Sequence, residues 1–367
     1  MQQSIDIVIP SFRLNEKVLI EIFSLKKPEG YEINYFLVAD NPSIAISQTF
    51  SEHLEKIKVH LIINGVNLGF SKTRNKGIDA GIAEWVLLLD DDIIAERDLL
   101  IFYADAIQEY PDSLGFAGST QFPKPFNTVT QALYLNGSVG HFSPKEKGKE
   151  IAWTPTANVL LNRKKLSNRR FKPELVNGGE DIELLFKNCV ENSQKYITIP
   201  DAMVTHPWWD NGKSQLKRMF RYGQGIGDII NLPYQKKYSY IDFTTTTESI
   251  FFFLLASALL WTVRINATPL LVLTVTILIA ELITNSLRSI SLSGKVSISL
   301  AFQMFLHKNA FEGGVLFQIL KKGKLKFLFR RLDVTFRKPN PSPFRLNRWK
   351  IIKLWIIVTL SVIYLIV

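Results

Sequence analysis

The feature that most constrains this fold is the uneven distribution of apolar residues along the chain. Apolar residues make up 47% of the 367 residues, but residues 249–287 and 351–367 are far richer than the rest. Stretches this long and this apolar are typical of helices that contact lipid. We therefore predict a first domain of residues 1–231 followed by a membrane-associated helical region of residues 232–367.

The apolar segments predict three membrane helices or fewer. Residues 249–263 and 265–280 are nearly uninterrupted, separated by Arg264 and a polar turn, and predict a helical hairpin within 249–287. Each run is shorter than the roughly 20 residues of a full span, so a crossing hairpin and a re-entrant one both stay open. Residues 351–367 predict a terminal helix, and residues 288–350 a basic interfacial segment.

Charge supports a location beside a membrane. The net charge is +11, and the segment from Lys321 to Lys353 holds twelve basic residues against one acid, Asp333. A basic run next to apolar segments predicts contact with anionic lipid headgroups on the cytoplasmic side. Nucleic-acid binding is the rival, but the apolar neighbours argue against it, so we expect no nucleic-acid partner.

Two further features place the first domain in the cytoplasm. The only cysteine, Cys189, cannot form an internal disulfide, which fits a reducing compartment. The N-terminal residues predict a strand and not a signal peptide. We therefore expect an inner-membrane protein with its first domain on the cytoplasmic side, of open oligomeric state.

The first domain has the alternating pattern of an α/β fold. Residues 5–9, 35–38, 59–63 and 85–89 are short apolar runs, each followed by polar or helix-forming sequence. This rhythm predicts a Rossmann-like sheet of parallel strands covered by helices, with ligands at the carboxyl ends of the strands. Residues 214–230 predict an amphipathic helix at the membrane interface, with a second half weakened by glycines at 223, 225 and 227.

Three adjacent carboxylates follow the strand at 85–89. Asp90, Asp91 and Asp92 repel one another, so the cluster is costly unless a cation is present. A divalent metal with oxygen ligands, bridging to a diphosphate, would relieve that repulsion. A solvated acidic loop is the alternative.

Two later segments also carry candidate site residues. Glu180 and Asp181 open a helical stretch, where a carboxylate serves either as a general base or as a favourable first-turn charge. His206 is a metal ligand or a structural histidine. Trp208 and Trp209 stack on a bound ligand or anchor the chain at the interface, and Trp153 is a weaker candidate for the same ligand contact.

These motifs together resemble family 2 glycosyltransferases of the GT-A fold, over about residues 4–230. The resemblance rests on the segment Ile7-Val8-Ile9-Pro10-Ser11-Phe12-Arg13, on Val38-Ala39-Asp40-Asn41, on Asn67-Leu68-Gly69 with Arg74-Asn75-Lys76-Gly77, on Asp90-Asp91-Asp92, and on Gly179-Glu180-Asp181. The chain is similar to membrane-associated bacterial members, with some similarity to galactofuranosyl- and rhamnosyltransferases around His206-Pro207-Trp208.

The resemblance implies roles for the residues in these motifs. The residues implied to bind the nucleotide-sugar are Pro10, Ser11, Phe12, Arg13, Asp40, Asn67, Arg74, Asp90 and Asp91. Asp90, Asp92 and His206 would bind Mn²⁺ or Mg²⁺. Asp181 would be the catalytic base, with Glu180 as the alternative.

The acceptor side is less specific. Gln215-Leu216-Lys217-Arg218 resembles the Gln-x-x-Arg-Trp motif of processive synthases, but Met219 replaces the Trp. We assign acceptor binding to Trp153, Trp208, Trp209 and Arg218. The expected function is inverting transfer from a nucleotide-diphosphate sugar to a lipid-linked or other membrane-associated glycan in cell-surface glycan synthesis. A processive polysaccharide synthase is the main alternative, with a nucleotidyltransferase or a non-enzymatic scaffold less favoured.

Overall fold

The computed structural model describes residues 3–140, 142–339 and 345–366, and it forms two compact units. The first unit is Met1–Lys124, Val139–Val176 and Glu180–Trp208; the second is Pro125–Ser138, Asn177–Gly179 and Trp209–Val367. Val367, the last residue of the predicted terminal helix, lies outside the described residues.

The first unit is built on a mixed nine-stranded sheet within the described residues, with the order β3-β2-β1-β4-β8-β6-β9-β5 and with β7 paired to β9. The strands β3, β2, β1 and β4 are parallel, β8 is antiparallel to both neighbours, and β6 and β9 are parallel. The strands are β1 (Gln3–Ser11), β2 (Tyr31–Ala39), β3 (His60–Ile63), β4 (Trp85–Leu89), β5 (Ile94–Ala95), β6 (Gly115–Gln121), β7 (Glu150–Ile151), β8 (Asn158–Asn162) and β9 (Tyr196–Thr205).

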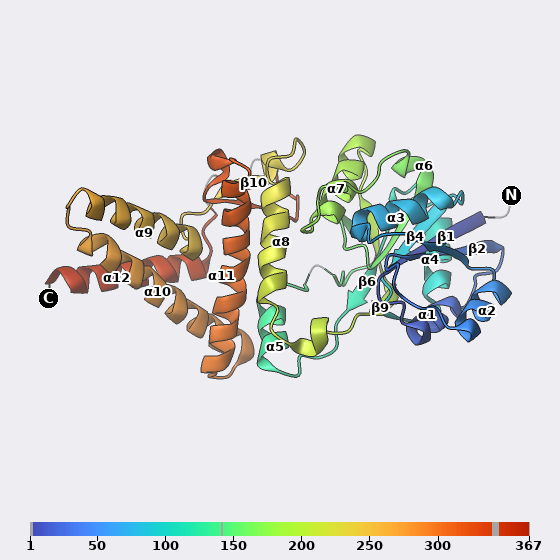
Figure 1. The fold of residues 1–367 in the computed structure, drawn as a ribbon, viewed down its shortest axis with the longest axis horizontal. Coiled ribbons are helices and arrows are strands. Elements are labelled where there is room, and N and C mark those ends of the chain that lie inside the picture. The colour runs from blue at the N-terminus through green and yellow to red at the C-terminus, as the bar shows by residue number, and fades with distance from the viewer. Residues whose placement is uncertain (1–2, 141, 340–344, 367) are drawn as a thin grey trace. The chain divides into compact units, whose positions relative to one another are not determined.

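Helices cover both faces of this sheet (Figure 1). They are α1 (Glu16–Phe23), α2 (Gln48–Lys56), α3 (Gly69–Ala80), α4 (Leu99–Glu109), α6 (Arg163–Leu166) and α7 (Glu180–Asn192). Alternate residues of a strand enter different cores: Ile7 and Ile9 pack with α1, α2 and α4, whereas Val8 packs with α3, α6 and α7. The predicted α/β class is confirmed.

The predicted strands at 5–9, 35–38, 59–63 and 85–89 are confirmed as β1 to β4. The sequence did not reveal β6, β8 or β9. Strand β6 contains two glycines and three polar residues, and β9 contains Pro200. Neither has the uninterrupted apolar run that marks a buried strand, so tertiary pairing decides these strands.

The second unit is helical. It contains α5 (Thr128–Leu135), α8 (Leu216–Ile229), α9 (Thr246–Thr262), α10 (Thr268–Ser293), α11 (Ile298–Lys321) and α12 (Arg348–Ile366), with a small sheet of β10 (Ser239–Ile241) and β11 (Arg330–Leu332). The predicted hairpin corresponds to α9 and α10. Among the described residues, α10 and α12 are long and apolar enough to cross a membrane, and α9 is a shorter apolar helix.

Helices α8 and α11 pack side by side at very short range (Figure 1). The predicted helix at residues 214–230 corresponds to α8, which runs through all three glycines. Gly223 and Gly227 lie one turn apart and face α11, where a Cβ at Gly223 would lie 2.0 Å from the carbonyl oxygen of Phe311. On α11, a Cβ at Gly314 would lie 1.9 Å from the carbonyl oxygen of Phe220. These glycines therefore permit backbone-to-backbone packing.

Candidate functional site

The sheet order places the predicted motifs at one edge of the first unit. Strands β2, β1 and β4 are parallel neighbours that end at Ala39, Ser11 and Leu89. Asp40, Ser11 and Asp90 therefore meet at the carboxyl ends of adjacent strands, where ligands bind in open α/β sheets.

A second pairing brings His206 to the same place. Strand β5 pairs with β9 so that Ile94 lies opposite Thr205. Asp92 precedes β5 and His206 follows β9, so the two side chains approach each other. Ligand atoms of Asp90, Asp92 and His206 all lie within 4.8 Å of one another. Two carboxylates and one imidazole in this arrangement can hold a divalent cation.

The histidine ring is oriented for such a role. Nδ1 of His206 lies 2.6 Å from the carbonyl oxygen of Pro207, which can only accept, so Nδ1 carries the proton. In the neutral ring, the lone pair of Nε2 then faces Oδ1 of Asp92 at 3.2 Å. Two acceptors at this distance require a cation between them or a second proton on the ring. The residues present therefore fit a divalent metal.

Arg13 and Ser11 hold the other oxygens of the aspartate cluster. Nη2 of Arg13 lies 2.5 Å from Oδ2 of Asp92 and 3.4 Å from Oδ1 of Asp91, although the Arg13 side chain is 63% exposed. Ser11 Oγ donates to Oδ2 of the buried Asp91 at 2.6 Å. The guanidinium of Arg13 therefore contacts Asp92, which is also one of the three candidate metal ligands.

A buried arginine connects the aspartate cluster to the second carboxylate motif. Arg74 on α3 places Nη1 3.0 Å from Oε1 of Glu180 and Nη2 3.4 Å from Oδ1 of Asp90. The Arg74 side chain is only 10% exposed. A buried ion pair is weakened when either partner moves. Arg74 therefore links the position of Asp90 to that of Glu180 at the start of α7.

Asp181 follows Glu180 at the start of α7. Burial of its carboxyl group, with the nearby charge of Glu180, raises the pKa of Asp181 to about 7. Oδ1 accepts a hydrogen bond from the backbone N–H of Ile182 at 2.7 Å, which opposes the rise. Unlike Glu180, which is ion-paired with Arg74, Asp181 is poised to exchange a proton near neutral pH.

Asp40 and Asn67 shape the loop before α3. The carboxylate of Asp40 accepts from the backbone N–H groups of Leu68 and Gly69 and from Nδ2 of Asn64, each at 2.8 Å. Oδ1 of Asn67 accepts from the Gly69 N–H at 3.0 Å. In this structure both side chains fix the loop, and their roles in nucleotide binding stay predictions, as do those of Pro10 and of the 52% exposed Phe12.

Two of the three aromatic candidates, Trp208 and Trp209, are buried. Trp208 is buried, packs on Phe122 and donates from Nε1 to the carbonyl oxygen of Pro123. Trp153 packs against the core behind the sheet. Trp209 and Arg218 belong to the second unit, where the Arg218 guanidinium lies 4.8 Å from the Trp209 ring centre. Their assignment to acceptor binding stays a prediction.

Sequence reasoning missed two parts of the site. Arg74 was assigned to the nucleotide, and nothing in its motif reveals the ion pair to Glu180, 106 residues away. Phe122, which stacks on the His206 ring at 5.1 Å, had no motif at all. Its position directly after β6, beside the end of β9, becomes visible only once those strands are known.

Comparisons with solved structures return distant likenesses. Structures that resemble the chain include S. aureus TarS residues 1–349 (13% identity, TM-score 0.46, 88% of this chain and 92% of that one) and GalNAc-T7 with UDP, GalNAc and Mn²⁺ (14% identity, TM-score 0.46, 68% of this chain and 51% of that one). These likenesses are too distant to support a conclusion about this chain's substrates. No match was found among curated proteins.

A sequence family gives the more direct result. Residues 6–167 match the family described as glycosyl transferase family 2. This range contains the ends of β1, β2 and β4, with the aspartate cluster that follows β4. The predicted resemblance is confirmed at the level of the family, whereas similarity to galactofuranosyl- and rhamnosyltransferases stays a prediction. The match to glycosyl transferase family 2 is therefore carried by residues 6–167, which include most of the first unit's nucleotide-side motifs.

Proposed function

We propose that the protein transfers a sugar from a nucleoside-diphosphate donor to a membrane-associated glycan or lipid-linked acceptor, with inversion at the anomeric carbon, in cell-surface glycan synthesis. The observation that carries the proposal is the meeting of Asp90, Asp92 and His206 at the carboxyl edge of a family 2 domain. Arg74 joins this cluster to the motif that contains Asp181.

The three-residue cluster would hold Mn²⁺ or Mg²⁺. When bound there, the metal would neutralise charge on the diphosphate leaving group. Arg13 and Ser11 lie at the same edge, and Arg13 has an exposed cationic side chain suited to a phosphate oxygen. At this edge, Asp90 and Asp91 would also contact the nucleotide-sugar.

Asp181 would accept the proton of the attacking acceptor hydroxyl. Its pKa of about 7 leaves it substantially deprotonated at neutral pH, yet basic enough to take a proton. Glu180 is a weaker candidate because its carboxylate is held in a buried ion pair with Arg74. A single displacement with one base inverts configuration.

The second unit would place this chemistry beside a bilayer. Two of its helices have the length and composition of membrane spans, and the segment from Lys321 to Lys353 is strongly basic. Anionic headgroups on the cytoplasmic side of the inner membrane would attract that segment. A lipid-linked acceptor would then be concentrated where the catalytic domain lies.

The test combines metal binding with turnover. Asp92→Asn should abolish Mn²⁺ binding measured by calorimetry and should remove nearly all transfer, because it takes a charged ligand from the cluster. Asp98→Asn is a matched control, since Asp98 is exposed and pairs only with Lys26 among the contacts described. Full transfer by the native chain in excess chelator would contradict the metal assignment, and no hydrolysis of any nucleotide-sugar in a donor panel would contradict the function.

A further inference from the structure

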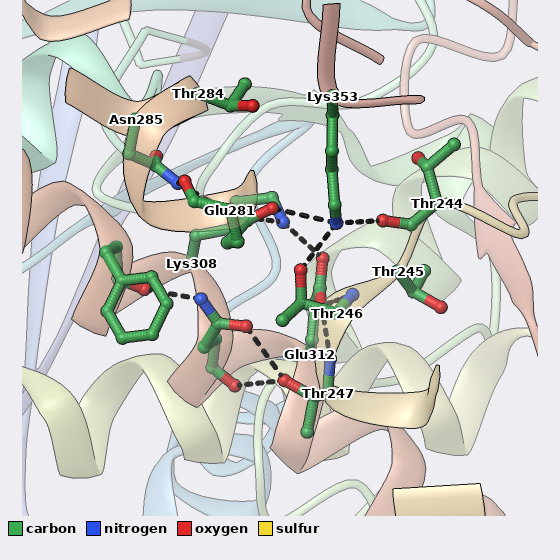
Figure 2. A network of polar contacts seen from close by, with 12 residues as sticks. Thr244, Thr245, Thr246, Thr247, Glu281, Thr284, Asn285, Lys308, Glu312 and Lys353 are labelled. Carbon is green, nitrogen blue, oxygen red and sulfur yellow. Dashed lines mark hydrogen bonds and ion pairs between the residues drawn. The ribbon is translucent and has the colours of Figure 1, made fainter. Parts of the chain in front are cut away.

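A cluster of charges, buried except for the partly exposed Lys308, lies among the apolar helices of the second unit (Figure 2). It consists of Glu281 on α10, Lys308 and Glu312 on α11, and Lys353 on α12. Lys308 lies 2.7 Å from Glu281 and 2.8 Å from Glu312, and Lys353 lies 2.8 Å from Glu281. Two carboxylates and two ammonium groups cancel in charge, so the cluster is neutral as a whole. We call these four residues the ionic cluster.

The ionic cluster also completes the hydrogen bonding of an irregular segment. Residues 244 and 245 precede α9, and the backbone N–H groups of its first two residues, Thr246 and Thr247, donate to Oε2 of Glu312 at 3.0 and 3.2 Å. Nζ of Lys353 donates to the carbonyl oxygen of Thr244 and to Oγ1 of Thr246, each at 2.5 Å (Figure 2). The cluster therefore satisfies a buried helix start from within the protein. Inside a bilayer, non-helical backbone is tolerated only where the protein itself supplies such partners.

The neighbouring helices carry polar markers at both ends. On α10, Arg288 lies seven residues after Glu281, and on α12, Arg348 lies five residues before Lys353. At about 1.5 Å per residue, these arginines are about 10 Å and about 8 Å from the cluster along their helices. At the opposite end, Trp261 in the last turn of α9 is 79% exposed, and Arg264 is exposed on the turn between α9 and α10. Arginine and tryptophan at helix ends are typical of the two membrane interfaces.

The distance between these markers matches a bilayer. The part of α10 from Thr268 to Arg288 is about 30 Å long and α12 is about 27 Å, close to the hydrocarbon thickness of about 30 Å. Helix α9 is shorter, about 24 Å, but it begins at the level of the ionic cluster and not at Arg288. Starting about 8–10 Å deeper, it reaches the same far end.

Many apolar side chains between these arginine and tryptophan markers are exposed in the described structure. Val358 and Val362 on α12 are 52% and 47% exposed, and Leu271 and Val275 on α10 are 45% and 54% exposed. A soluble core helix would bury such residues. Lipid acyl chains are the partner that fits this apolar surface, which arginines bound at both ends of the α9–α10 pair and at the start of α12.

We propose that α9, α10 and α12 cross the bilayer as one three-helix bundle, with the ionic cluster held inside the membrane close to its cytoplasmic side. The turn at residues 263–267 and the end of α12 reach the far surface. The cluster allows α9 to begin within the membrane by satisfying its first N–H groups. This inference rests on the membrane location in the proposed function but does not depend on the transfer reaction.

The test is site-specific labelling of the full-length chain in sealed membrane vesicles of defined orientation. Single cysteines are introduced into a Cys189→Ala background as Ile265→Cys, Leu365→Cys, Lys322→Cys and Val358→Cys, and an impermeant maleimide is added before or after detergent. Positions 265 and 365 should label only from the far side, and position 322 only from the cytoplasmic side. Position 358 should label from neither side until detergent is added.

Each other pattern would contradict the bundle. Labelling of 265 and 322 from the same side would show a peripheral or re-entrant helix pair, and protection of 265 from both sides would show a hairpin that ends inside the bilayer. Labelling of 358 without detergent would place α12 in water. Donor binding by each variant, measured on the same vesicles, separates this result from the glycosyl transfer, because the labelling pattern can hold even if transfer is absent.

Discussion

The ionisation of a single carboxylate, Asp181, determines how the proposed transfer responds to pH. An ordinary aspartate titrates near pH 4, but burial and the neighbouring Glu180 raise the pKa of Asp181 to about 7. Only the deprotonated form accepts a proton from the acceptor. We therefore expect kcat/KM to rise with pH and to level off above about pH 7.

Replacement of the same residue separates binding from chemistry. Asp181→Asn should leave nucleotide-sugar affinity within a few-fold and lower turnover by ~10²–10⁴, the usual contribution of a general base. The remaining activity should lose its dependence on pH near 7. Calorimetry and pH–rate profiles on the same preparation measure both effects. Glu180 is the base if Glu180→Gln abolishes turnover and Asp181→Asn does not. In that case the free energy of unfolding of Glu180→Gln must be unchanged, so that loss of the ion pair with Arg74 does not explain the result.

We expect Arg13 to compete with a bound metal for Asp92. Its guanidinium lies 2.5 Å from Oδ2 of Asp92, so Arg13→Ala should strengthen Mn²⁺ binding several-fold in the absence of nucleotide. If Arg13 pairs with the diphosphate once donor binds, the same substitution should weaken UDP binding about tenfold or more, as expected for a lost charge-assisted hydrogen bond.

The size of the two effects, compared with a matched control, distinguishes direct contact from a general charge effect. Removing any nearby positive charge would favour Mn²⁺ and disfavour the anionic UDP, but an exposed charge without direct contact should change both constants only slightly. Arg170→Ala, which removes an ion pair with Asp79 elsewhere in the first unit, is the matched control. Calorimetric titrations with Mn²⁺ alone and with UDP in saturating Mn²⁺ measure both constants. A loss of Mn²⁺ affinity in Arg13→Ala would contradict the competition.

Individual residues were predictable where chemistry and chain position coincide. Asp90 and Asp92 are recognisable because adjacent carboxylates after an apolar strand require a counter-charge. The bridge from Arg74 to Glu180 was not predictable, since it depends on how α3 and α7 pack on the same face of the sheet. His206 was found by resemblance, and its approach to Asp92 follows from the pairing of β5 with β9.

At the scale of elements, the contact between α8 and α11 depends on glycine at particular positions. Gly313 and Gly314 are adjacent on α11, but only at Gly314 would an added Cβ meet a backbone carbonyl oxygen, that of Phe220, at 1.9 Å. A Cβ at Gly313 would meet the Phe220 ring at an ordinary 3.7 Å. The two positions form a matched pair because both substitutions make the same change in helix propensity.

We expect opposite effects on stability. Gly314→Ala should lower the free energy of unfolding by about 1–3 kcal/mol or more, since the helices must separate. Gly313→Ala should raise it by up to about 1 kcal/mol through better helix propensity. Thermal unfolding of the two variants in the same detergent decides between them. Equal effects would show that α8 and α11 do not pack at this distance.

The ionic cluster predicts a non-additive pair of substitutions. Glu281→Gln leaves a buried cluster with one excess positive charge, and Lys353→Met leaves one excess negative charge. Breaking a buried pair in this way costs about 3–5 kcal/mol. The double variant restores neutrality, because Lys308 and Glu312 still pair at 2.8 Å. It should therefore be more stable than Lys353→Met alone, and thermal unfolding measures this coupling.

A double variant as unstable as the sum of the two singles would show that the charges act independently.

The pairing of Glu281 with Lys353 was not predictable from the sequence, because the two residues lie far apart in the chain, on helices whose sequences are mostly apolar. Uninterrupted apolar runs identified α9, α10 and α12, yet such runs carry no information on which buried charges meet. Strands β6, β8 and β9 were missed for the related reason that pairing, and not local composition, defines them.

At the scale of the whole molecule, the helical unit bears on whether the enzyme is processive. A processive synthase keeps hold of its growing chain, usually through a water-filled channel lined by several helices. Two helices of the second unit have the length of spans and a third is shorter. Three helices from one chain are too few to enclose a path for a polar glycan.

The structure of α8 points the same way. Met219 takes the place of the Trp in the motif of processive synthases, and here it is buried, with its sulfur 3.8 Å from Oγ of Ser138 on the turn after α5. The buried side chain packs within the second unit and does not present an aromatic surface to an acceptor. We therefore predict that the enzyme adds one sugar, or very few, before it releases the acceptor.

The measurement is product length at low conversion. A trace of enzyme is incubated with excess acceptor and donor, and the products are sized while most of the acceptor is still unreacted. A non-processive enzyme releases its acceptor after each step, so extension by one sugar should spread across the whole acceptor pool. Long products beside untouched acceptor would show retention of the chain. Met219→Trp is the informative variant, because lengthened products in that variant alone would locate the limit on processivity at α8, whereas unchanged products would assign it to the small number of membrane helices.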